Sequence, residues 1–438
     1  MPCPHAMNFS REGVSRRGYF RFALAMGGVS AFTACLERED SLGLPEIPHG
    51  HSNPSELPIR QHEWDDYMLR DVHGNIRNPE FQSLLFFDVV NDLPPAEEER
   101  DRMEEAFRGI EEAFSWGTAK AGDEPLEANP GVLFTVGYSH QYFDRFGRSL
   151  SDDVELRYPE DTLTAINEHP NHADEFDVCI HIATDYPSVL LGVEEALQGN
   201  VRHVNGTEMK SDLAGILKRR ERRSGFVGRG LPREHIELSD IPENAHNSMG
   251  FRSGLRDSLP PEDKVTISSG TFGEGTLQHI SKLRIRLDRW YALSADQRVH
   301  RMFSPEHSVR DIGTGGEEIG AESGMTRDLA RRLDEHADQD GVVGHAQKLS
   351  RVRDDDFHPR ILRRADFNAA DPAGSILHFG ALHRTEADLL DTLTAMRGTG
   401  EKNPRVSRPD DGILHYIHTV TRGNYLIPPR PARSLPAP

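Results

Sequence analysis

The chain has 438 residues, with 51 Lys and Arg against 71 Asp and Glu and a formal net charge of -20. This length is sufficient for two domains that each bury a core. Only seven of the cationic residues are lysine, and an acidic surface that prefers arginine is expected where high salt screens the protein's self-repulsion. The same charge argues against nucleic acid or an anionic membrane surface as a direct partner.

Cysteine content limits the chemistry further. Cys3 and Cys35 lie in the N-terminal segment described next, which leaves Cys179 alone in the expected mature domain. A single cysteine can form neither a disulfide framework nor a cysteine zinc site.

Residues 1–35 are expected to be a twin-arginine export signal. Residues 15–21 read S-R-R-G-Y-F-R, and the apolar stretch after them is too short to span a bilayer. Such signals export folded cargo, so the protein is expected outside the cell or on the outer face of its membrane. F-T-A-C at 32–35 resembles a lipobox that would place a lipid anchor on Cys35, and cleavage just before Leu36 is the alternative.

The next segments are expected to be a tether and a first domain. Residues 36–78 are assigned to an acidic tether, because their first part is rich in Pro, Gly and Ser. Residues 79–245 are assigned to the first domain. The β-branched and aromatic pattern predicts strands, and apolar steps of three and four predict helices. Strands are expected from 83 to 91 and at 132–136 and 176–183, helices at 96–116 and 186–197, and the basic run 218–223 as a salt-bridged helix face.

Residues 246–430 are expected to repeat this order before a short tail at 431–438. Strands are predicted at 277–288, 360–367 and 375–381, helices at 294–302 and 385–396, and a long functional loop at 304–343 with a helix at 326–337. Thr385 can cap its helix. The fold class is therefore α+β, with two facing ferredoxin-like halves, that is, a duplicated split βαβ of antiparallel sheets and helices arranged like a dimeric α+β barrel.

Several segments together resemble the dye-decolourising peroxidase superfamily over roughly residues 80 to 430. V-L-F-T-V-G-Y-S-H-Q-Y-F-D at 132–144 and F-D-V-C-I-H-I-A at 176–183 are similar to strands of its first half. G-I-L-H-Y-I-H-T-V-T-R-G-N-Y-L-I-P-P at 412–429 resembles its closing helix and the Pro-Pro end. Each match is weak, and their shared order is the specific signal.

The resemblance implies a haem b site. G-H-A-Q-K-L-S-R at 344–351 looks like the proximal-histidine motif, so His345 would be the axial ligand of the iron. R-I-L-R-R-A-D-F at 360–367 looks like the strand of the distal arginine, so Arg363 would hold peroxide on the opposite face of a haem between the two sheet halves. His378 and His383 are weaker rivals as ligands.

The distal side departs from the family's G-x-x-D-G pattern. M-G-F-R-S-G at 249–254 aligns best, with Gly250, Phe251, Gly254 and the later Leu377 expected beside the cofactor. Ser253 then stands where the family has the aspartate that takes a proton from peroxide, and a serine is no base at neutral pH.

An alternative register makes Asp257 that base. A third option leaves Arg363 to act with an ordered water.

Three functional readings follow from this resemblance. The first is an oxidoreductase that reduces peroxide and oxidises an organic donor, weakened by the change at Ser253, with Trp290 and Tyr291 as electron-relay candidates or simple packing residues. The second is an exported haem or porphyrin carrier without catalysis. A scaffold without cofactor is the third reading. A homo-oligomer is compatible with each.

Overall fold

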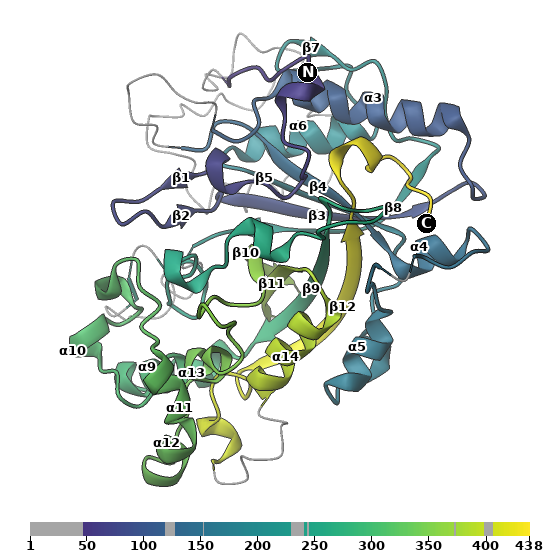
Figure 1. Cartoon of the computed structure of the whole chain (residues 1–438). Helices are drawn as coiled ribbons and strands as arrows, with labels where there is room; N and C mark the ends of the chain where they lie inside the picture. Colours follow the sequence, from purple (N-terminus) through teal and green to yellow (C-terminus); the bar gives the residue numbers. More distant parts are fainter. Residues whose placement is uncertain are drawn as a thin grey trace.

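The computed structural model describes residues 47–118, 128–151, 153–228, 241–242, 245–371, 374–397 and 406–438. Eight long strands in the described part form a closed barrel in the order β10-β11-β9-β12-β4-β5-β3-β8. The export signal and the first residues of the tether lie outside the described residues. The barrel is made from two halves of the chain (Figure 1).

The N-terminal half supplies four of these strands and two crossover helices. In this half β3 lies beside β5, β4 is at one edge, and β8 is at the other. The elements are β3 (Phe81–Val89), α3 (Glu97–Ala113), β4 (Leu133–Ser139), α4 (His140–Asp144), α5 (Pro159–Ala165), β5 (Val178–Thr184), α6 (Pro187–Leu197) and β8 (Leu217–Phe226). Short hairpins flank them: β1 (Leu69–Arg70) with β2 (Ile76–Arg77), and β6 (His203–Val204) with β7 (Thr207–Glu208).

The C-terminal half repeats the strand order with a long insertion of short helices after its first strand. The strands are β9 (Thr276–Ile285), β10 (Leu362–Asp371), β11 (Gly374–His383) and β12 (Ile417–Ile427). The helices are α8 (Leu287–Trp290), α9 (Ala295–Met302), α10 (Val309–Ile312), α11 (Arg327–Arg331), α12 (Leu333–Gln339), α13 (His345–Ser350) and α14 (Glu386–Arg397). As expected, Thr385 caps α14, because its hydroxyl accepts from the Asp388 amide at 3.3 Å.

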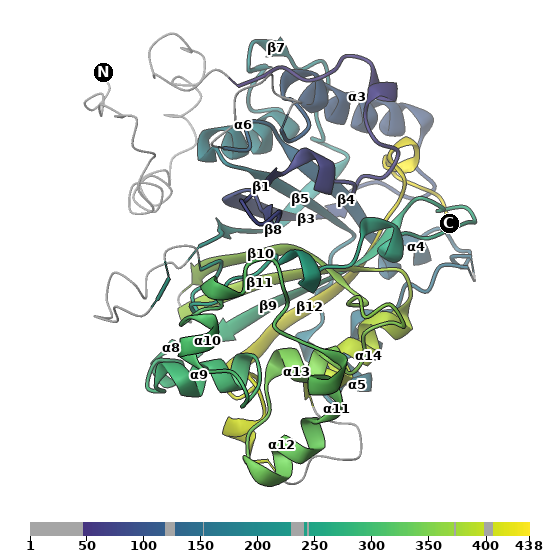
Figure 2. The same cartoon turned by 60° about the vertical axis from the view of Figure 1, so that its left-hand side comes forward.

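Both halves therefore have ferredoxin-like order, and the predicted fold class is confirmed. The halves join where β12 pairs with β4 and where β10 meets β8. Helices α3 and α6 cover the outer face of the N-terminal sheet, and the insertion and α14 cover that of the C-terminal sheet (Figures 1 and 2). Inside the barrel, Leu84 and Phe86 of one sheet are in a cluster with Ile280, Phe367 and Tyr425 of the other.

Two segments expected to be helical are strands instead. Residues 412–429 contain β12, which pairs with β9 along its length. Its β-branched and aromatic residues favour a pleated strand over a helix. The basic run 218–223 lies in β8, where the arginines pair with acidic residues outside the sheet: Arg222 with Glu194 of α6 at 2.6 Å, and Arg223 with Asp174 in the loop before β5 at 2.7 Å. The predicted helix at 326–337 is broken into α11 and α12 at Arg332.

The expected tether and tail are both packed onto the fold. Gln61, His62 and Trp64 are buried, so the tether cannot extend to residue 78. Arg433 and Leu435 of the tail are buried against the N-terminal half, where the Tyr138 hydroxyl donates to the Arg433 carbonyl at 2.6 Å. Among the described residues, no helix is both long and apolar enough to cross a membrane.

Candidate functional site

A cavity of about 730 Å³ lies against the outer face of the C-terminal sheet. Its volume is within the roughly 300–1,000 Å³ typical of ligand sites. Strands β9 to β12 form one wall, and α9, α13 and α14 with the loop 247–258 form the others. The expectation that the cofactor site lies between the two sheets is therefore wrong in position, because packed side chains fill the barrel interior.

His345 lines this cavity from the first turn of α13. The preceding Gly344 is required by close packing, since a Cβ there would lie 1.8 Å from the Phe303 carbonyl oxygen. Burial, aided by the charges of Lys348 and Arg363, lowers the pKa of His345 to about 3, so the ring is neutral at neutral pH. Within the described part of the chain neither ring nitrogen has a hydrogen-bond partner, and Nδ1 is buried. A neutral imidazole without partners is a ready metal ligand.

Strand β10 brings two charged groups to the same cavity. Arg363 pairs with Ala381 and Ala365 pairs with Gly380, so Arg364 is an extra residue in the ladder. Because this bulge shifts the alternation of side chains by one residue, Arg363 and Asp366 share a face and both line the cavity. Arg364 is buried elsewhere, between Asp65 and Glu262.

Asp366 was not singled out from the sequence, although it lies in the quoted R-R-A-D-F run. Its Oδ2 accepts a hydrogen bond from the Ser253 hydroxyl at 2.8 Å. Burial raises the pKa of Asp366, whereas the Arg363 charge and the Ser253 hydrogen bond lower it. Ser253 itself is buried and lines the cavity with Phe251.

The loop 247–254 holds Ser253 in place. Gly250 and Gly254 have φ values of +88° and +75°, which glycine adopts without strain, and neither lines the cavity. The Trp290 indole donates to the Met249 carbonyl at 2.9 Å, and the Tyr291 hydroxyl donates to the Ser248 carbonyl at 2.7 Å. These two aromatics therefore support the loop.

Asp257, the alternative base, faces a second cavity of about 490 Å³. Its side chain is 48% exposed and lies 3.4 Å from Arg256. Arg353, Met325 and Ser323 line both cavities and lie between them. The structure thus brings Ser253, but not Asp257, together with Arg363.

The remaining predicted residues divide in the same way. Leu377 lines the main cavity from β11, beside Phe379. His378 and His383 do not line it: His378 is buried against the Phe367 ring, and His383 donates from Nδ1 to the Thr385 carbonyl at 2.9 Å.

The lining of the main cavity also contains several arginines. Arg422, buried on β12, pairs with Glu168 at 2.8 Å, and Arg397 of α14 reaches the same carboxylate. Arg408 also lines this cavity. Guanidinium groups in this position can bind carboxylates of a ligand.

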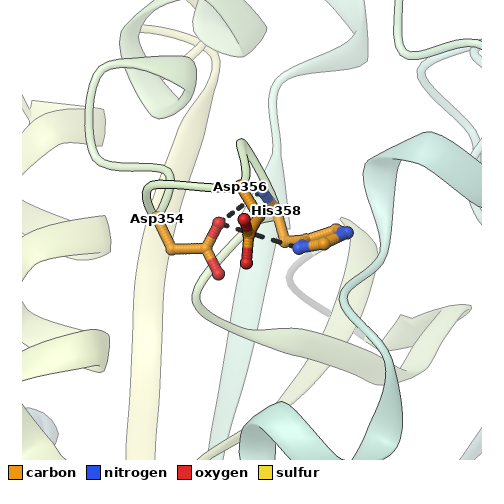
Figure 3. A group of neighbouring side chains, drawn as sticks. All are labelled: Asp354, Asp356 and His358. Carbon is orange, nitrogen blue, oxygen red and sulfur yellow. Dashed lines mark hydrogen bonds and ion pairs between the residues drawn. The ribbon is translucent and has the colours of Figure 1, made fainter.

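A group of potential metal ligands, Asp354, Asp356 and His358, lies near the second cavity (Figure 3). The Lys264 ammonium lies 3.1 Å from Asp354 and 3.4 Å from Asp356, so a protein cation already balances these carboxylates. The His358 amide donates to the Asp354 carboxylate at 2.7 Å, so a local turn explains why these three side chains lie close together.

Comparison with solved structures shows the same fold in DyP-type peroxidases. DtpA from Streptomyces lividans is 18% identical, with a TM-score of 0.52, covering 83% of this chain and 93% of that one. A DyP-type peroxidase protein of Shewanella oneidensis is 15% identical, with a TM-score of 0.52 and coverages of 81% and 94%. A Rhodococcus jostii DypB variant in complex with heme is 15% identical, with a TM-score of 0.50 and coverages of 82% and 96%.

Sequence comparison gives a family but no characterised relative. No curated protein matches the chain. One family model matches residues 79–429, which includes both ferredoxin-like halves and every residue of the cavity named above. The chain therefore belongs to the family of unknown function DUF7405.

Proposed function

We propose that this protein binds haem b through His345 and reduces peroxide with oxidation of an organic donor. One observation carries the proposal: a single cavity holds a neutral, unpartnered imidazole on a helix and an arginine beside a carboxylate on the facing strand. The shared fold with DyP-type peroxidases, including a heme complex, supports it.

The cavity residues fit an iron porphyrin. The buried, orphaned Nδ1 of His345 leaves the imidazole free of competing partners, which suits an axial ligand. Met249, Phe251 and Phe379 belong to the largely apolar lining that a macrocycle requires. Arg397 and Arg408 are suited to its carboxylates.

Each residue then has a defined role. Bound haem would supply the redox-active iron at which the peroxide O–O bond is cleaved. His345 holds that iron, and Arg363 binds the peroxide anion and stabilises the charge that develops as the bond breaks. The apolar lining excludes bulk water, which strengthens both electrostatic contacts.

The direct test is an absorption spectrum of full-length protein purified from cells supplied with haem, followed by a peroxide-consumption assay. We expect a Soret band and a peroxide rate above that of free haem at equal concentration. A Soret band without that rate would favour the carrier function. Colourless protein that does not take up added haem would contradict both.

Arg363→Ala tests the distal half of the proposal. We expect peroxide turnover to fall by roughly 10²–10³-fold while the Soret band is kept, because a positioned donor to the developing charge is lost. Arg363→Lys should recover only part of the rate, since an ammonium lacks the planar fork. Arg310→Ala, an exposed arginine on α10 away from the cavity, is the control and should match wild type. An unchanged rate in Arg363→Ala would remove this role.

Export to the outside of the cell is a separate proposal. It rests on the paired Arg16 and Arg17 and on the F-T-A-C run, which lie outside the described residues. A twin-arginine pathway would allow the cofactor to be loaded before export. Mass spectrometry of the mature N-terminus distinguishes a lipidated Cys35 from cleavage before Leu36.

A further inference from the structure

Asp366 is a buried carboxylate that the cavity leaves partly unsatisfied. Its Oδ2 accepts from Ser253 at 2.8 Å. The other oxygen, Oδ1, has no hydrogen-bond partner among the described residues, and it is not sealed from the cavity that Asp366 lines. A buried carboxylate in a purely structural role is normally hydrogen-bonded at both oxygens, so one free oxygen indicates a ligand-facing group.

We infer that Asp366 is the acid–base group of this cavity and that Ser253 is the residue that positions it. The inference rests on the proposed function. Ser253 stands where dye-decolourising peroxidases are expected to have the aspartate that accepts the proton. The Ser253 hydroxyl donates to Asp366, a carboxylate that reaches this part of the cavity from β10. The catalytic carboxylate is thus relocated from the loop to the strand that carries Arg363.

The two other candidates are less suitable. The Ser253 hydroxyl cannot accept a proton at neutral pH, and it is already the donor to Asp366. Asp257 is half-exposed, pairs with Arg256, and lies at the neighbouring cavity. Among these three groups, Asp366 alone combines an ionisable oxygen with a place beside Arg363.

The surroundings of Asp366 suit proton transfer. Burial raises its pKa, and Arg363 and Ser253 keep it from rising further. Besides Arg363, the other titratable or charged groups that line the cavity are Glu168, His169, His172, Arg252, His345, Arg353, Arg360, Arg397, Arg408, Asp411, His418 and Arg422. His246 acts indirectly, because its Nδ1 accepts from the Ser253 amide at 3.2 Å. A carboxylate tuned upward in this way transfers protons efficiently nearer neutral pH.

The proton step is balanced within the cavity. Hydrogen peroxide gives the proton of one oxygen to Asp366, and Arg363 holds the resulting anion. Asp366 then returns that proton to the other oxygen, which leaves as water when the O–O bond breaks. Bound haem would supply the two electrons consumed, and the organic donor would replace them.

Asp366→Asn tests the inference in the haem-loaded protein. We expect an unchanged Soret band and a peroxide reaction slower by roughly 10²–10⁴-fold. Cyanide gives a second readout independent of turnover, since hydrogen cyanide must also lose a proton to bind as an anion; its association rate, followed by the Soret shift, should fall too. Asp177→Asn is the matched control, because Asp177 is also buried with a raised pKa but pairs with Arg145, and neither residue lines the cavity. It should leave both rates unchanged.

Two further variants separate positioning from packing. Ser253→Ala removes a hydrogen bond that favours the charged carboxylate, so the acid limb of the peroxide rate should move to higher pH. Adding Ser253→Asp to Asp366→Asn returns a carboxylate to the loop and should restore part of both rates. If wild type binds haem and consumes peroxide but Asp366→Asn equals it in peroxide and cyanide rates, the inference is overturned and the proposed function stands. If wild type binds no haem, the proposed function itself fails.

Discussion

We expect His345→Ala to abolish the Soret band that the proposed function predicts for protein purified from haem-supplied cells. The expectation follows from the ring's position: it lines the cavity, burial keeps it neutral, and neither nitrogen has a hydrogen-bond partner among the described residues. Without the imidazole, no side chain would bind the iron. The amount of haem that the protein keeps through dialysis should therefore decrease together with the Soret absorbance. Titration of haem into the purified variant measures both effects.

His378→Ala is the matched control for that experiment. His378 is also a buried histidine, but it packs against Phe367 and does not line the cavity. Its spectrum should equal that of wild type. A normal Soret band in His345→Ala, or loss of the band in His378→Ala alone, would contradict the ligand assignment.

Much of the fold could be predicted because local pattern and tertiary environment agree. Strand β3 is a nearly continuous apolar run, and α3 places Met103, Phe107 and Ile110 on one buried face. Strand β8 could not be recognised, because its arginines show no apolar alternation. They are stabilised by Asp174 and Glu194, which only the folded sheet brings near. Residues 412–429 were expected to form a helix because they resemble the closing helix of dye-decolourising peroxidases. Their β-branched and aromatic residues instead form β12, which pairs with β9.

The site shows the same limit at a finer scale. The resemblance to dye-decolourising peroxidases implied that His345, Arg363 and Ser253 surround one cofactor, and the three residues do line one cavity. Asp366 could not be predicted in this way. On a regular strand it would face away from Arg363, and a single extra residue at Arg364 reverses that relation. Register shifts of this kind depend on pairing between β10 and β11, which no local sequence signal specifies.

The C-terminal tail is a second place where long-range pairing replaces a local signal. Arg433, fully buried, donates to Glu104 at 3.1 Å and to Glu111 at 2.9 Å, both on α3. Its guanidinium also lies over the rings of Phe107 and Phe134. Arg430 shares the Glu111 carboxylate. The last residues of the chain thereby attach the end of the C-terminal half to the helix that covers the N-terminal sheet.

Arg433→Ala should therefore lower the free energy of unfolding by about 3–5 kcal/mol, because it leaves two carboxylates facing a buried site with one cation fewer. Urea unfolding followed by circular dichroism measures the change. Arg108→Ala is the control: Arg108 meets the same Glu104, at 3.3 Å, but its side chain is 58% exposed, so its loss should cost only about 0.3–0.5 kcal/mol. If the two variants have equal stability, the tail does not fasten the two halves, and its burial reflects packing alone.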